Sequence, residues 1–113
     1  MGLFEGIEPR TATIIAGASL SDAIDLEGYI PVGIVMPAVW TAANITFEEE
    51  STFDAYDAAG TELTAIAAAS RYIALDPIDF AGFRSIYLRS GTTGVPVNQV
   101  AEAEIILLIR KLS

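Results

Sequence analysis

The pattern of apolar and polar positions along the chain predicts short β-strands in close succession. The densest apolar stretch, residues 29–36, is rich in β-branched side chains and carries no charge, as in a strand buried on both faces. Pro37 has no N–H to give a sheet ladder and is expected to end this strand. Residues 44–48 alternate polar and apolar positions, which is typical of a half-buried strand. We expect the fold to be organised around these two strands and the loop between them, which holds Trp40.

Other segments repeat these two patterns. Further strands are expected at residues 11–15, 22–26, 52–57, 61–65, 70–75, 83–90 and 102–109. Residues 76–81 differ, because Asp76 can cap a helical turn whose first position suits Pro77, and Gly82 can end it. The length of 113 residues fits one domain. The chain is therefore predicted to be an all-β, single-domain antiparallel β-sandwich with about eight strands and one short helical turn.

Six apolar or aromatic side chains are expected to form the structural core of this sandwich. They are Ile34, Trp40, Phe47, Tyr72, Ile86 and Leu107. Trp40 is expected to close one end of the sandwich, because a buried aromatic ring contributes a large apolar area. The alternative for Trp40 is an exposed platform on which a sugar ring stacks.

Residues 1–10 show no regular period and are expected to form an extended N-terminal arm, followed by the sandwich domain at residues 11–113. Two glycines and a proline interrupt regular structure in this segment, yet it carries three bulky apolar side chains. Such side chains suit burial against a partner. Candidate contact residues are Leu3, Phe4, Ile7 and Arg10.

Composition limits the possible partners. Hydrophobic residues make up 52% of the chain and the mean hydropathy is +0.47, which is high for a monomer, so we expect a homo-oligomer. No apolar run reaches the ~18 residues that a membrane span requires. The formal net charge of −9 would repel a phosphate backbone or an anionic bilayer. We therefore expect neither nucleic acid nor membrane as a partner.

The chain offers little catalytic material, because it contains no cysteine and no histidine. Nothing in the spacing of the carboxylates selects a catalytic pair, so we expect no enzyme activity and no cofactor. A calcium site between Asp54 and Asp57 is the alternative, but these residues lack a glycine-punctuated loop, and no metal is expected. The acidic run at residues 48–50 is expected to be a solvated loop. Arg84 and Arg89 are expected on opposite faces of one strand, each paired with an acidic neighbour.

Three groups of short segments carry a resemblance to a known family. They are GIVMP at 33–37 with WT at 40–41, YIALDP at 72–77 with FAG at 80–82, and RSG at 89–91 with VNQ at 97–99. Over residues 11–110 the chain resembles a family of small tailed-phage virion structural proteins. It is more distantly similar to galactose-binding-like jelly rolls, and this similarity implies that the predicted β-sandwich is jelly-roll-like. It departs from these at residues 48–51, where EEES replaces an Asp-Gly turn, and this departure argues against a glycan-binding loop there.

The resemblance implies a non-enzymatic structural role in a virion. The chain is then a capsid decoration (cement) protein that binds the outer shell of a tailed-phage head and stabilises it. Its expected partners are the major capsid protein and further copies of itself in a homotrimer. It would be made in the cytoplasm of the bacterial host and would end on the capsid surface. The alternative is a carbohydrate-binding module of a phage head or tail fibre.

Overall fold

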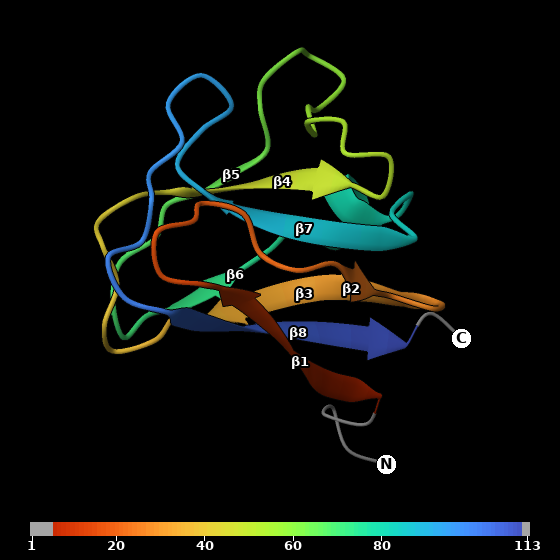
Figure 1. The fold of residues 1–113 in the computed structure, drawn as a ribbon. Helices are drawn as coiled ribbons and strands as arrows, with labels where there is room; N and C mark the ends of the chain where they lie inside the picture. Colours follow the sequence, from red (N-terminus) through yellow and green to blue (C-terminus); the bar gives the residue numbers. More distant parts are fainter. Residues whose placement is uncertain (1–5, 112–113) are drawn as a thin grey trace.

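The computed structural model of the chain describes residues 6–111, and nearly all of their regular structure is β-strand (Figure 1). The elements are β1 (Ile7–Ile14), β2 (Ile24–Asp25), β3 (Tyr29–Val35), β4 (Ile45–Glu49), β5 (Thr64–Ala65), β6 (Tyr72–Ala74), the 3-10 helix η1 (Pro77–Phe80), β7 (Ser85–Ser90) and β8 (Ala103–Lys111). The predicted helical turn is confirmed. Asp76 caps η1 by accepting a hydrogen bond from the Ile78 N–H, and Pro77 occupies the first helical position.

The strands form two antiparallel sheets of four strands each, which face one another as a sandwich (Figure 1). Sheet 1 has the strand order β1-β8-β3-β6, and sheet 2 has the order β2-β7-β4-β5. Apart from the β4–β5 connection, every link between consecutive strands crosses from one sheet to the other. This pair of strand orders is the jelly-roll topology. The predicted fold class is therefore confirmed.

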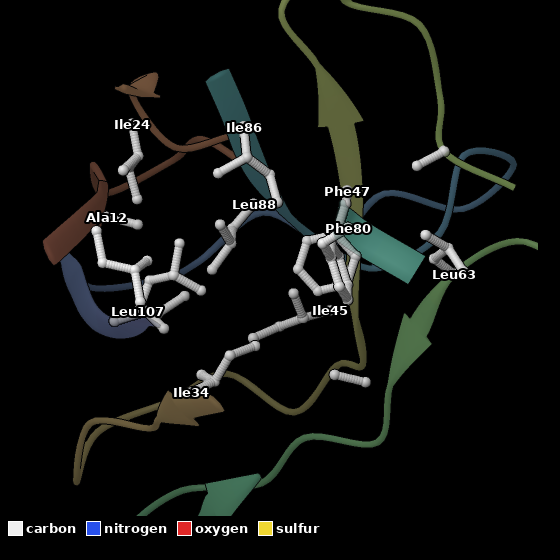
Figure 2. Packing of buried hydrophobic residues seen from close by; sticks show 14 of the residues in the cluster. Ala12, Ile24, Ile34, Ile45, Phe47, Leu63, Phe80, Ile86, Leu88 and Leu107 are labelled. Carbon is white, nitrogen blue, oxygen red and sulfur yellow. The ribbon is translucent and has the colours of Figure 1, made fainter. Parts of the chain in front are cut away.

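The core fills the space between the sheets with alternate residues of the long strands. Ile34, Phe47, Ile86 and Leu107 are fully buried there, as predicted (Figure 2). The ring of Phe80 reaches the core from η1 and packs edge-on against Phe47, with 4.9 Å between the ring centroids. Burial of these side chains is the main favourable contribution to folding.

Two of the predicted core residues lie elsewhere. The side chain of Tyr72 is 59% exposed, so its assignment to the core was wrong. In the register of β6 with β3, Ile73 lies opposite the buried Ile34, and Tyr72 therefore points to the outer face. Trp40 is partly buried against the margin of the core, where its indole N–H donates a hydrogen bond to the Ala43 carbonyl at 3.0 Å.

The predicted boundary between an arm and a domain at residue 10 was also wrong. β1 begins at Ile7, and its residues pair with β8 along its whole length, from Ile7 opposite Arg110 onward. The nine-residue strand β8 offers an edge long enough for residues 7–10 to satisfy their backbone groups by pairing with it. Leu3 and Phe4 lie outside the described residues.

Candidate functional site

The two outer faces of the sandwich differ in what covers them. In Figure 1 the loops at residues 50–63 and 91–97 stand over sheet 2. Among residues 6–111, no comparable loop crosses the outer face of sheet 1, which looks toward the bottom of the same view. The sequence could not show this difference, because it depends on which side of its sheet each loop folds.

Strand register identifies the side chains on the sheet 1 outer face. Tyr72 lies on this face with its ring over Gly33, where an added Cβ would come within 2.8 Å of the ring. Residues directly opposite each other in a ladder share a face of the sheet. Gly33 and Val35 lie opposite Leu108 and Ile106 of β8, which in turn lie opposite Pro9 and Thr11 of β1, so the face continues across the sheet. The central residues of the face are Pro9, Thr11, Val35, Tyr72, Ile106 and Leu108. All six are uncharged, so this face is the candidate interaction surface.

Charge is distributed unevenly around this surface. The four strands of sheet 1 contain two acidic and three basic residues, a net charge of +1. The whole chain has 15 acidic and 6 basic residues, which leaves 13 acidic and three basic residues elsewhere, a net charge of −10. Like-charge repulsion therefore opposes close approach of two acidic surfaces, while sheet 1 is the part of the molecule where this repulsion is weakest.

The two predicted contact residues that the structure describes lie on opposite faces of β1. Ile7 is opposite Arg110 and shares the outer face of sheet 1. Arg10 points to the other side, where it pairs with Glu8 at 3.0 Å and lies over the ring of Tyr29, 5.5 Å from its centroid. The Tyr29 hydroxyl donates to Glu8 at 2.6 Å. This hydrogen bond, followed by the one from Arg10, lowers the pKa of Glu8, and the same bond raises the pKa of Tyr29.

A buried arginine on β7 holds the loop over sheet 2. The side chain of Arg89 is only 7% exposed and forms ion pairs with Glu48, with Asp54 and, at 3.4 Å, with Glu62. Burial alone would lower the pKa of Arg89, but its hydrogen bonds with Glu48 and Asp54 outweigh burial and raise it. Its Nη1 also donates to the hydroxyl of Thr46 at 3.1 Å. Since its partners come from β4 and from the loop at residues 50–63, this arginine fixes that loop to the sheet.

The ion pairs of Arg84 and Arg89 with acidic residues were predicted, but the burial of part of the acidic run at residues 48–50 was not. Arg84 pairs with Glu50 at 3.1 Å, as Arg89 pairs with its own acidic neighbours. Glu48, however, belongs to β4 and its side chain is 14% exposed, so its assignment to a solvated loop was wrong. Asp54 and Tyr56 form only isolated bridges, in place of the strand expected at residues 52–57. Within residues 6–111, no group of three or more His, Cys, Asp or Glu residues is arranged to hold a metal ion.

The end of the sandwich near Trp40 is tied together by Gln99, which the sequence analysis did not single out. Its buried amide accepts from the Thr41 N–H at 2.8 Å, donates to the Thr41 carbonyl at 3.0 Å and donates to the Ser90 hydroxyl at 2.7 Å. Three of the segments quoted above for the family resemblance, at 40–41, 89–91 and 97–99, therefore meet at one side chain. This contact is structural, since every polar atom of Gln99 is satisfied within the chain.

Comparison with known family models, curated proteins and solved structures found no match to this chain. The part of the chain that the structure describes contains no helix with the length and apolarity that crossing a bilayer requires.

Proposed function

We propose that this chain is a non-enzymatic virion structural protein, a decoration (cement) protein that binds the outer shell of a tailed-phage head. The observation that carries the proposal is the sheet 1 outer face, which is uncharged at its centre and uncovered, on a jelly roll that is otherwise strongly acidic. In this proposal, sheet 1 lies against the major capsid protein and the acidic loops over sheet 2 face solvent. The resemblance to small tailed-phage virion proteins supports the same role.

The size of the face supports the attachment of several copies together. Strands ~4.8 Å apart with a rise of ~3.3 Å per residue give the four strands of sheet 1, which are three to nine residues long, a flat area of roughly 400 Å². A stable interface buries about 800 Å² on each partner, so one copy would bind weakly through this face alone. Association of three copies as a homotrimer would multiply the contacts and hold the protein on the shell by avidity.

The proposal is tested by the abundance and position of the protein in virions of the source phage. Mass spectrometry and electron cryo-microscopy should find hundreds of copies spread over the head. Ile106→Asp places a charge at the centre of the sheet 1 outer face and should lower occupancy on undecorated heads at least tenfold. The control is Val95→Asp, which makes the same kind of change at an exposed position in the loop at residues 91–97. Equal occupancy of both variants would contradict the proposal.

The second candidate is a carbohydrate-binding module of a head or tail fibre. It is favoured by aromatic side chains that are more than half exposed, Tyr72 at 59% and Tyr56 at 52%. Trp40 does not favour it, because its ring lies against the core margin and its N–H is already bonded within the chain. A few copies at one end of the virion, together with a sugar that quenches tyrosine fluorescence, would support this function in place of decoration.

A further inference from the structure

The edge strand β6 leaves backbone hydrogen-bonding groups unused. β6 pairs only with β3, and the Leu75 N–H donates to the Val32 carbonyl at 3.1 Å on that side. In an antiparallel ladder alternate residues face the partner strand, so Tyr72 and Ala74 direct their N–H and C=O groups away from β3. No other group among residues 6–111 bonds to them, and both residues are exposed. These four groups form a template for one more strand.

The opposite edge of sheet 1 is protected against such pairing. β1 is longer than β6, but the Thr13 N–H donates to the Asp22 carboxylate at 2.9 Å and the Asp22 N–H donates to the Thr13 carbonyl at 3.2 Å. Pro9, also on β1, has no N–H to donate. Both features are common ways to protect an edge strand. β6 contains neither a proline nor a covering loop, so the two edges of one sheet differ in their capacity to accept a strand.

A hollow with both apolar and polar groups in its lining adjoins the open edge of β6. It lies between β5 and β6, has a volume of about 280 Å³ and reaches Phe47, Leu63 and Phe80. Figure 2 shows the rings of Phe47 and Phe80 together at the centre of the buried cluster. The side chains of a strand alternate between its two faces, so a segment added to β6 would direct every second side chain toward this hollow.

The charges around the hollow are all negative. Asp76 and Asp79 line it, and no basic residue does. A second hollow of about 290 Å³ shares Leu63 and Asp79 with the first and adds Glu49 and Asp54 to the lining. Asp76 is occupied as the cap of η1, whereas no hydrogen bond or ion pair involves the exposed Asp79 carboxylate among the described residues. The site is therefore suited to a basic side chain next to an apolar one.

We propose that the free edge of β6 and the hollow beside it form a docking site for an extended segment of a partner protein. The segment adds a strand to sheet 1 through the backbone of Tyr72 and Ala74. It places one bulky apolar side chain in the hollow and one lysine or arginine at Asp79. This is strand addition, in which main-chain bonds supply affinity and a pocket supplies specificity. The site lies at the edge of sheet 1 and does not depend on the decoration role proposed above.

A display library of random seven-residue peptides, selected on the full-length protein, tests the proposal. Selection should enrich peptides in which a basic residue lies close to a bulky apolar one. An enriched peptide should shift the amide resonances of Tyr72 and Ala74 in nuclear magnetic resonance spectra. Ala74→Pro removes an N–H that β3 does not use, and it should weaken binding about tenfold, as should the charge reversal Asp79→Lys. The matched control, Ala58→Pro at the exposed second position of the turn at residues 57–60, should bind as the parent does.

Several results would overturn the proposal. The proposal fails if selection enriches no peptide. It also fails if the enriched peptides bind Asp79→Lys with an affinity within twofold of their affinity for the parent protein. Shifts of the Tyr72 and Ala74 amides that depend on protein concentration without peptide would identify a second copy as the occupant in place of a partner protein. If Ala74→Pro fails to fold, Asp79→Lys and the amide shifts of the parent decide the matter.

Discussion

Replacing Arg89 by leucine removes the one positive charge among three carboxylates. The side chains of Glu48, Glu62 and Asp54 are 14%, 16% and 30% exposed, so water compensates them only in part. Breaking a buried ion pair from one side costs about 3–5 kcal/mol, because the remaining charge stays buried without its partner. We expect Arg89→Leu to lower the free energy of unfolding by that amount. The corresponding fall in Tm is about 10–20 °C for a domain of this size.

The matched control is Arg84→Leu, the same change at the other arginine near β7. Its side chain is 82% exposed and its pair with Glu50 lies in solvent, so the expected loss is about 0–1 kcal/mol. Urea unfolding followed by circular dichroism at pH 7 measures both variants. Equal losses in the two variants, or a loss below about 1 kcal/mol for Arg89→Leu, would refute the reasoning.

Three further predictions concern sheet 1 and the end of the sandwich. Gly33→Ala should cost less than about 1 kcal/mol, because the added Cβ meets the far end of the exposed Tyr72 ring, which can move aside. Any remaining cost should disappear in the background of Tyr72→Ala, as a double-mutant cycle in urea can show. The lowered pKa of Glu8 means that the stability contributed by its carboxylate is present at neutral pH and is lost as pH falls through that pKa. The parent should therefore lose more stability than Glu8→Gln between neutral pH and about pH 3. Equal losses would mean that the hydrogen bond from Tyr29 to Glu8 contributes nothing to stability. Trp40→Ala should lower the free energy of unfolding by about 2 kcal/mol, below the 3–5 kcal/mol typical of a fully buried ring. Iodide should quench the Trp40 fluorescence of the native protein to an intermediate degree. A strongly red-shifted and freely quenched emission would contradict the partly buried position of Trp40.

The local pattern of the sequence was sufficient to predict most of the elements and the fold class. The uncharged, β-branched run at residues 29–36 predicted β3, and the end at Pro37 agrees with the observed strand end at Val35 to within two residues. Asp76 and Pro77 predicted η1, because capping depends on neighbouring residues alone. Apolar periodicity is also a local signal, and it predicted four residues that are buried in the core, Ile34, Phe47, Ile86 and Leu107.

Tertiary structure decided which groups meet and which faces stay open. Glu48 reads as part of a solvated acidic run until β4 brings it beside Arg89, 41 residues away in sequence. Tyr72 and Ile73 are equally plausible core residues until the register with Ile34 assigns one to each face, because a shift of one residue exchanges the two faces of a strand. The uncovered face of sheet 1 and the free edge of β6 also result from the packing of distant strands and loops. Contacts over such distances depend on the whole topology, which no local window of the sequence contains.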